Sequence, residues 1–469
     1  MDPERAKRRQ SLKVIISETI MVLSVICIVT VLAFLVSGYW INSDFKIERQ
    51  GLLQISSIPI GADVHIDNES SWLQRTSTSK VLSSGEHTIT LTKDGYDSWS
   101  KTIKISEGLL YKIHYPRLFP TDRTKEDVLE TNGTIMATVS PNHNYLLLIN
   151  NTTEWELLNL NDDNVKSTKI DVSEIFSNVS LAENTKKGLF IGEIDKTDWD
   201  HDNSHILFKV KSGDAIEWVL LDVKNVNNSI NISKEFGSQF SEIRILDNSA
   251  NNLLAVQNNN LHKIDLPKKS LSNVLVKNVI NFDHYKNNEI AFSAKNDESE
   301  NDNYYVGLLK IGDEKTEKLK DTESPAKIVL SIFYDEEYIT IMEKNIVTLF
   351  NKKDFNKVSE FELAFEPSSM LVGHNGEFII MHSGPQIATL DMESISVTEW
   401  KTSGETFDWL DNDMIYSVSN GELAVYDYDS LNYRVVANNV SDHFPVMITS
   451  DKWLYYFSDN TLIRESLNR

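Results

Sequence analysis

Three aspartates, Asp198, Asp200 and Asp202, recur at every second position in the stretch DWDHDN. Carboxylates at this spacing are typical of calcium-binding loops, which surround the hard cation with oxygen atoms. Such a loop also uses a glycine at its sixth position and a glutamate at its twelfth, where this chain has Asn203 and Lys209. The three aspartates are therefore candidate metal ligands, with calcium as the ion, and a polar turn between strands is the competing interpretation.

Few other patterns in the chain carry chemistry. Residues 297–303 form an acidic run, which we interpret as a solvated loop because clustered like charges repel one another. The sequence contains no His-Glu-x-x-His motif, no Gly-x-Ser-x-Gly motif and no phosphate-binding glycine loop. It therefore identifies no catalytic residue and predicts no cofactor. Histidines such as His143 and His284 fall in or near predicted turns, where only the fold could bring them together.

Composition limits the class of partner. The formal net charge is −23, which argues against nucleic acid, because phosphate binding needs clustered lysines and arginines. The one cysteine, Cys27, lies inside an apolar segment, so the rest of the chain has neither disulfides nor cysteine metal ligands. That remainder must be held together by its hydrophobic core, which a chain of this length can supply.

The apolar segment runs from residue 14 to residue 36, with Val14 and Val36 at its ends and Glu18 as its one charged residue. About 20 apolar residues suffice to cross a bilayer. Tyr39 and Trp40 follow, where aromatic side chains often mark the membrane interface. We therefore predict a transmembrane helix over residues 14–40, embedded in lipid, followed by a linker over 41–51.

The basic flank sets the predicted orientation of this helix. Residues 1–13 hold five basic residues against two acidic ones, and such a flank stays on the cytoplasmic side. We expect a single-pass protein of the cell membrane, with a cytoplasmic tail over 1–13 and its bulk outside the cytoplasm. The alternative is a cleaved signal peptide, whose apolar core is typically about 7–15 residues and thus shorter than this one.

Short alternating strands and turns follow the predicted linker. Pro59 cannot donate a ladder hydrogen bond and ends a strand, and Gly61 permits a turn before Ala62 opens the next run. Further on, Gly85 opens a strand and Gly95 turns the chain before Tyr96. The pattern predicts a compact β-module.

This layout resembles the PEGA domain, a small β-sandwich of microbial envelope proteins. The resemblance covers residues 52–118 and rests on SIPIGADVHID at 57–67, SGEH at 84–87 and KDGY at 93–96. Ile60 stands where the motif has glutamate, and the usual Thr-Pro is missing near Thr76. The resemblance implies a fold without catalysis, because its motif residues are turn and core residues.

From about residue 119 to the end, one pattern recurs. A polar turn precedes a short apolar run, and a second turn and a second apolar run follow, as in residues 141–160 and 411–427. The pattern occurs eight times at intervals of roughly 37–60 residues, the spacing of propeller blades. Each repeat predicts two central strands of a four-stranded blade, whose faces only a closed ring can bury.

The repeats resemble propellers of the WD40 and TolB types, whose blades carry a Trp-x-x-Asp-Gly turn. The nearest matches are residues 199–203 and 409–413, with asparagine or aspartate in place of glycine. Asparagine also tolerates a left-handed backbone. We predict a mainly β protein with a propeller over 119–469. It has eight blades if the strand near Ile135 completes the last one, and otherwise seven.

Propellers host unrelated activities, so architecture alone does not define function. The anchor, the PEGA-like module and the lack of catalytic motifs predict a structural or interaction role, in which the propeller binds an envelope or surface partner, protein or glycan. The alternative is a propeller hydrolase or lyase acting on envelope polymers, which would need titratable groups clustered at the ring's centre.

Overall fold

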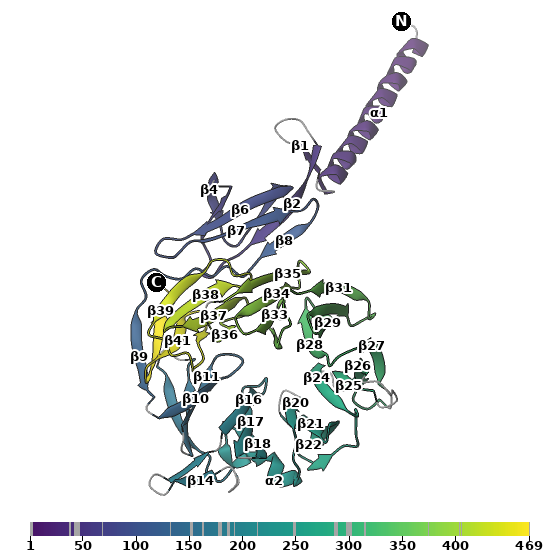
Figure 1. Cartoon of the computed structure of the whole chain (residues 1–469). Helices are drawn as coiled ribbons and strands as arrows, with labels where there is room; N and C mark the ends of the chain where they lie inside the picture. Colours follow the sequence, from purple (N-terminus) through teal and green to yellow (C-terminus); the bar gives the residue numbers. More distant parts are fainter. Residues whose placement is uncertain are drawn as a thin grey trace. The chain divides into compact units, whose positions relative to one another are not determined.

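The computed structural model describes residues 3–36, 39–41, 47–67, 69–131, 133–150, 153–161, 164–176, 181–184, 188–191, 193–212, 214–246, 250–285, 289–296, 303–313, 316–373, 375–402, 404 and 406–468. The chain divides into two compact units, Met1–Asp122 and Arg123–Arg469. Both are built mainly from β-strands (Figure 1), and each is described by itself.

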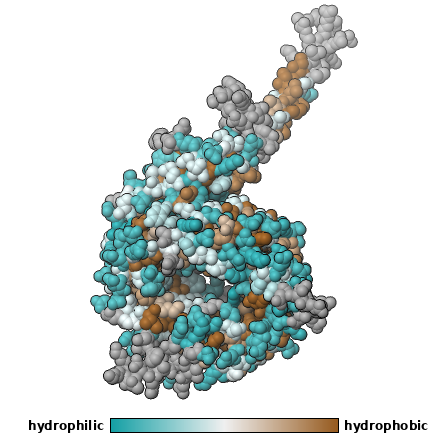
Figure 2. Space-filling view, in the orientation of Figure 1, coloured by the Kyte–Doolittle hydropathy of each residue, from teal (hydrophilic) through white to brown (hydrophobic). Residues whose placement is uncertain are grey.

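The first unit begins with the helix α1 (Pro3–Val36). It starts within the tail that was predicted over 1–13, because proline is tolerated in a first helical turn and the Lys, Arg and Gln residues that follow are good helix formers. Apolar side chains project from it, such as Leu23 and Ile28, which are 60% and 59% exposed. They give the helix its brown band in Figure 2.

The predicted transmembrane helix over 14–40 is not confirmed. Within the described ranges, no helical segment combines the length and the hydropathy that a membrane crossing requires. Val14 and Val36 lie in α1, and Tyr39 and Trp40 lie in the strand β1 (Tyr39–Ile41), but their side chains fall outside the described residues. β1 pairs with β2 (Ile47–Ile55), so part of the predicted linker is strand.

The rest of the first unit consists of two four-stranded sheets. One contains β1, β2, β5 (Thr78–Ser83) and β8 (Leu110–Ile113). The other has the order β4 (Glu69–Arg75), β3 (Asp63–Ile66), β6 (Gly85–Thr92), β7 (Trp99–Ile105). Along β7 buried and exposed residues alternate, as a half-buried strand requires.

The two sheets meet closely at Gly51 in β2. A Cβ atom at this position would lie 2.5 Å from Cγ2 of Ile105 and 2.6 Å from the carbonyl oxygen of Ser106. Trp99, which is fully buried, stacks edge-on with Tyr115 at a centroid distance of 6.0 Å. The module therefore has a core of its own, as a β-sandwich requires.

In the second unit the described residues form eight consecutive four-stranded sheets. Each blade is given from its innermost strand outward. The first blade consists of β10 (Thr134–Val139), β11 (Tyr145–Asn150), β12 (Glu154–Asn159) and β13 (Lys166–Asp171), and the second of β16 (Glu193–Trp199), β17 (His205–Ser212), β18 (Ala215–Asp222) and β19 (Ile230–Asn231). The third blade consists of β20 (Glu242–Ile245), β21 (Asn252–Gln257), β22 (Asn260–Asp265) and β23 (Ser270–Leu271), and the fourth of β24 (Val279–Tyr285), β25 (Glu289–Lys295), β26 (Tyr304–Lys310) and β27 (Glu317–Thr322).

The remaining four blades follow the same order from the innermost strand outward. The fifth blade consists of β28 (Lys327–Phe333), β29 (Glu336–Glu343), β30 (Ile346–Asn351) and β31 (Lys357–Glu362), and the sixth of β32 (Ser369–Val372), β33 (Phe378–Ser383), β34 (Gln386–Asp391) and β35 (Ser396–Lys401). The seventh blade consists of β36 (Thr406–Trp409), β37 (Met414–Ser419), β38 (Glu422–Asp427) and β39 (Arg434–Asn438), and the eighth of β40 (Met447–Thr449), β41 (Trp453–Ser458), β42 (Thr461–Ser466) and β9 (Lys125–Glu130).

The blades form a ring with their first strands innermost (Figure 1), and Figure 2 shows an opening near its centre. The ring closes in the eighth blade, where β9 pairs with β42. The predicted closure by the strand near Ile135 is wrong, because Ile135 lies in β10, the innermost strand of the first blade. The closing strand has too few apolar residues to match the repeated pattern, which is why the sequence did not reveal it.

Neighbouring blades pack through their apolar strands. Trp155 of the first blade is 1% exposed and its ring lies 5.2 Å from that of Phe208 in the second. Tyr455 and Leu146 belong to a cluster that joins the eighth blade to the first. The buried apolar runs need not alternate, because both faces of each sheet are covered.

Three short elements interrupt the ring. A two-stranded hairpin, β14 (Leu181–Asn184) with β15 (Gly188–Ile191), lies between the first and second blades in sequence. A 3-10 turn, η1 (Val226–Asn228), and a one-turn helix, α2 (Ile232–Phe236), flank β19.

Candidate functional site

We call the turn that joins the innermost strand of each blade to its second strand the inner turn. The three candidate aspartates sit at one of them and do not converge. Asp200 is 1% exposed, and its carboxylate accepts hydrogen bonds from the backbone N–H of Ser204 (2.7 Å) and His205 (2.9 Å) and from the His205 ring (2.7 Å). Asp198 lies in β16, and Asp202 is exposed.

The inner turn of the second blade is thus stabilised by its own side chains. Among the described residues, no three histidine, cysteine or acidic side chains are grouped so that they could hold a metal ion. Asn203 has a φ of 55°, as expected where asparagine replaces glycine in a left-handed turn. The aspartate spacing therefore corresponds to the turn interpretation in this structure.

The residues of the PEGA-like motif occupy turns and core. Gly61 has a φ of 80° and donates its N–H to the carbonyl of Thr76 at 2.8 Å. Ala62 is fully buried, and its N–H donates to Oγ1 of Thr76 at 3.0 Å. Gly85 and Gly95 have positive φ angles, Pro59 accepts a hydrogen bond from Ser57, and Tyr96 donates its N–H to the carbonyl of Lys93.

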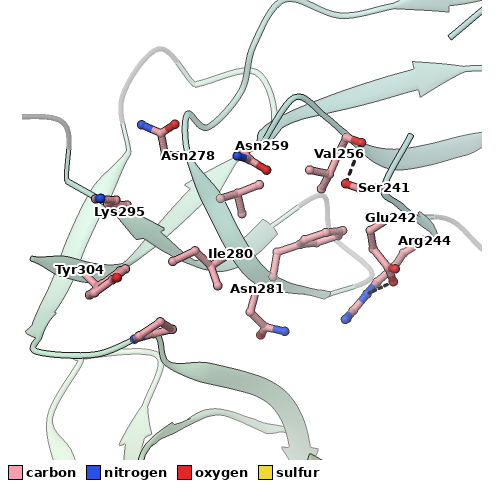
Figure 3. Close-up of a pocket in the computed structure, with 13 residues that line it drawn as sticks. Ser241, Glu242, Arg244, Val256, Asn259, Asn278, Ile280, Asn281, Lys295 and Tyr304 are labelled. Carbon is pink, nitrogen blue, oxygen red and sulfur yellow. Dashed lines mark hydrogen bonds and ion pairs between the residues drawn. The ribbon is translucent and has the colours of Figure 1, made fainter. Parts of the chain in front are cut away.

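The candidate binding site is a cavity of about 880 Å³ between the third and fourth blades (Figure 3). It lies where the innermost strands β20 and β24 begin, and the strand ends at Lys295 and Tyr304 form another side. Its size falls within the range of about 300–1,000 Å³ typical of ligand pockets. The sequence analysis did not identify the residues that line this cavity, because the fold brings them together from two different repeats.

The lining combines polar side chains with a small apolar surface. Asn259, Asn278 and Asn281 contribute amides, which both donate and accept hydrogen bonds. Ile280, 47% exposed, offers an apolar contact between Tyr304 and Asn281 (Figure 3). The cavity can therefore hold a polar ligand in a defined orientation.

Arg244 occupies the inner end of this cavity. Its Nε lies 3.7 Å from Oε1 of Glu242, too far for a hydrogen bond, and has no hydrogen-bond partner among the described residues. Its Nη1 lies 3.4 Å from Oδ1 of Asp283, and its guanidinium carbon lies 4.8 Å from the ring centroid of Phe282. The buried Nε–H is a donor that a ligand oxygen could satisfy.

The innermost strands also bring together a cluster of titratable groups around His284. The sequence places this histidine near a turn, but it lies within β24 beside Asp283. Burial lowers the pKa of His284, the negative charges of Asp283 and Asp198 act in the opposite direction, and Arg244 lowers it further. The Nδ1 atom of His284 is buried without a partner among the described residues. Periodicity in one blade could not have revealed a cluster drawn from three blades.

The comparison with protein families confirms the predicted resemblance of the first unit. Residues 50–117 match the PEGA domain. No curated protein sequence matches the chain.

Several solved structures are distantly similar to this chain. The computationally designed Ika8 protein matches with a TM-score of 0.45 and 9% identity, over 73% of this chain and 100% of that one. The β-propeller domain of Myceliophteria thermophila Cps50 (Swd1) matches with a TM-score of 0.41 and 8% identity, over 74% and 100%. An oligogalacturonate lyase in complex with manganese matches with a TM-score of 0.37 and 11% identity, over 59% and 90%. Likenesses this distant carry no argument about function.

Proposed function

We propose that this chain is a membrane-anchored interaction protein whose propeller binds an envelope or surface partner outside the cytoplasm. The observation that carries the binding role is the cavity between the third and fourth blades. It is large, polar and lined by amides, and it includes Arg244, whose Nε has no hydrogen-bond partner among the described residues. The match of residues 50–117 to the PEGA domain supports the same role, because its motif residues occupy turns and core.

The membrane attachment and the location rest on the amino-acid sequence. The apolar residues 14–36, the basic residues before them and the exposed apolar side chains of α1 support an anchor with a cytoplasmic N-terminus. Because Cys27 is the one cysteine, a Cys27→Ser background permits a clean labelling test. In intact cells, a membrane-impermeant maleimide should label Asp335→Cys in that background. Labelling that appears only after lysis would contradict the proposed location.

Binding can be tested with the full chain, purified in mild detergent. We expect it to retain a glycan on an envelope-glycan array or a protein from solubilised envelopes. Tyr304→Ala combined with Ile280→Ala should lower that binding at least tenfold, since both side chains line the cavity. The control is Tyr334→Ala, which removes an exposed tyrosine outside the cavity. Equal loss in the control, or no retained partner for the native chain, would refute the proposed site.

The alternative function is a hydrolase or lyase acting on envelope polymers. One observation favours it: the innermost strands place two carboxylates, Asp198 and Asp283, where their charges affect the ring of His284. A histidine with a lowered pKa is neutral at physiological pH and can accept a proton. If this function holds, the native chain should release reducing or unsaturated ends from envelope polymers, and His284→Gln should abolish the release.

A further inference from the structure

The second and seventh blades carry the same dipeptide at the same place. Asp198 and Trp199 are the last residues of β16, and Asp408 and Trp409 are the last residues of β36. In both blades the tryptophan pairs in register with an isoleucine of the second strand. The pattern of two repeats thus places two carboxylates and two indoles at the same level of the ring.

Both dipeptides line one cavity of about 430 Å³. Most of the other lining residues come from the first, sixth and eighth blades, and Thr197 and Tyr416 come from the second and seventh. They are mostly apolar or neutral, with His143 and Tyr416 as the remaining titratable ones. No lysine or arginine is among the described residues that line it. The cavity is therefore anionic and aromatic, which favours a cation over a neutral or anionic group.

The two tryptophans differ in their hydrogen bonding. The Nε1 atom of Trp199 donates to Oγ1 of Thr138 at 3.0 Å. Trp409 is only 7% exposed, and its buried Nε1 atom has no hydrogen-bond partner among the described residues. A buried N–H without an acceptor is costly, so an oxygen atom of a ligand that accepts this hydrogen bond would be bound favourably.

Ser140, Pro141 and His143 of the first blade's inner turn line this cavity, and hydrogen bonds join neighbouring inner turns. The backbone N–H of Asn142 donates to Asn203 (3.2 Å), which joins the turns of the first two blades, and Asn375 donates to Asp413 (3.1 Å) between the sixth and seventh. Exposed acidic residues on the described inner turns are Asp202, Asp335 and Asp451. Lys452, on the inner turn of the eighth blade, is half-buried, and its ammonium lies 5.5 Å from the ring of Trp453.

We propose that this cavity, the inner-turn pocket, binds a lysine or arginine side chain of a partner protein. The cationic head would lie between Asp198 and Asp408 and over the indole faces, and a backbone carbonyl of the partner would accept the Trp409 N–H. The acidic inner turns favour a basic polypeptide segment, because they extend the negative surface beyond what one small amine can contact. The inference rests on the proposed binding role of the propeller but not on the cavity between the third and fourth blades.

The test uses two labelled peptides and the full chain in mild detergent. One peptide has the sequence Ser-Gln-Gly-Arg-Gly-Gln-Ser with blocked ends, so that arginine is its one cation, and the other has citrulline in place of arginine. Citrulline keeps the shape and removes the charge, so the native chain should bind the arginine peptide at least tenfold more tightly in fluorescence anisotropy. Asp198→Asn with Asp408→Asn should abolish this preference, and Trp409→Phe should reduce it severalfold.

The control is Asp335→Asn, which removes one exposed carboxylate outside the pocket. It should weaken both peptides equally and by less than threefold. Equal binding of the two peptides to the native chain, or a preference that survives in the double variant with an unchanged melting temperature, would overturn the proposal. Arginine amide that binds as tightly as the peptide would overturn the assignment to a protein partner. The variant with Tyr304→Ala and Ile280→Ala should lose glycan or envelope binding without changing these peptide results. Failure of one proposal can therefore be distinguished from failure of the other.

Discussion

The guanidinium Nε of Arg123 lies 2.7 Å from Oε2 of Glu465. The two residues are 342 positions apart in sequence, and their ion pair joins the chain just before β9 to the strand β42 that β9 completes. Their side chains are only 16% and 10% exposed, and Tyr456 donates to the other oxygen of the same carboxylate at 2.6 Å. The closure of the ring is thus fixed by a nearly buried charge pair as well as by strand pairing.

Arg123→Ala should therefore destabilise the propeller strongly. It leaves the Glu465 carboxylate buried without its cation, which costs about 3–5 kcal/mol in comparable pairs. The measurement is urea unfolding followed by tryptophan fluorescence. Lys268→Ala removes an ion pair of equal length in which the lysine is 77% exposed, and it should cost no more than about 1 kcal/mol. Similar costs for the two variants would show that the closing pair has no special weight.

Gly51→Ala should destabilise the PEGA domain. The added Cβ would meet the backbone oxygen of Ser106 at 2.6 Å and the side chain of Ile105 at 2.5 Å, so the two sheets would have to move apart. Overpacking of this kind costs about 1–3 kcal/mol. Hydrogen exchange in residues 50–117 should accelerate. Gln54→Ala, at an exposed position of the same strand, is the matched control and should change protection little.

The sequence was informative about elements whose residues are close together in the chain. The alternating residues around Leu53 and the turn at Gly61 predicted strands and a module that the structure and the family comparison confirm. The repeated apolar runs predicted a ring of stacked sheets, because such runs need cover on both faces. In these elements, the pattern of neighbouring residues is enough to predict the strand or turn that they form.

What the sequence could not predict depends on contacts between repeats. The closing strand β9 is mostly polar, and its partner is the end of the chain. Arg244 and Asp283 come from different blades, and nothing in either repeat indicates that they meet. The aspartate spacing at Asp200 is ambiguous because a turn and a metal loop use the same oxygen atoms, and the hydrogen bonds that Asp200 accepts from Ser204 and His205 cannot be predicted from that spacing.

The pair of His205 and Asp200 should make stability depend on pH. The hydrogen bond to Asp200 raises the pKa of His205, and burial acts against it. Burial acts to raise the pKa of Asp200, but its hydrogen bonds to His205 and Ser204 together hold it below its usual value. The histidine contribution is present below its unfolded pKa of about 6.5 and is lost as pH rises through the higher folded pKa. The aspartate contribution is lost only as pH falls through the depressed folded pKa.

His205→Gln should therefore cost more stability at pH 5.5 than at pH 9. The measurement is the urea midpoint of the native chain and the variant at both values. His443→Gln is the control, because that ring is 81% exposed. A difference between native chain and variant that does not change with pH would contradict a charged His205 in the folded protein.

Glu377 should produce a second pH dependence, at the inner turn of the sixth blade. Burial raises the pKa of Glu377 to about 8, and the charges of Asp413, Asp391 and Glu393 raise it as well. The folded chain then holds a proton that the unfolded chain releases near pH 4.5. Because the folded state binds this proton more tightly, the free energy of unfolding should fall as pH rises from about 4.5 to about 8 and level off above.

Glu377→Gln removes this loss, because the amide stays neutral at every pH. The variant should match the native chain near pH 5 and exceed it in stability at pH 8.5, by an amount on the order of a few kcal/mol, since one pKa unit corresponds to about 1.4 kcal/mol. Asp335→Asn, at an exposed carboxylate of another inner turn, should run parallel to the native chain. If the stability difference between Glu377→Gln and the native chain stays constant from pH 5 to pH 8.5, then Glu377 is ionised in the fold and the acidic inner turns are well solvated.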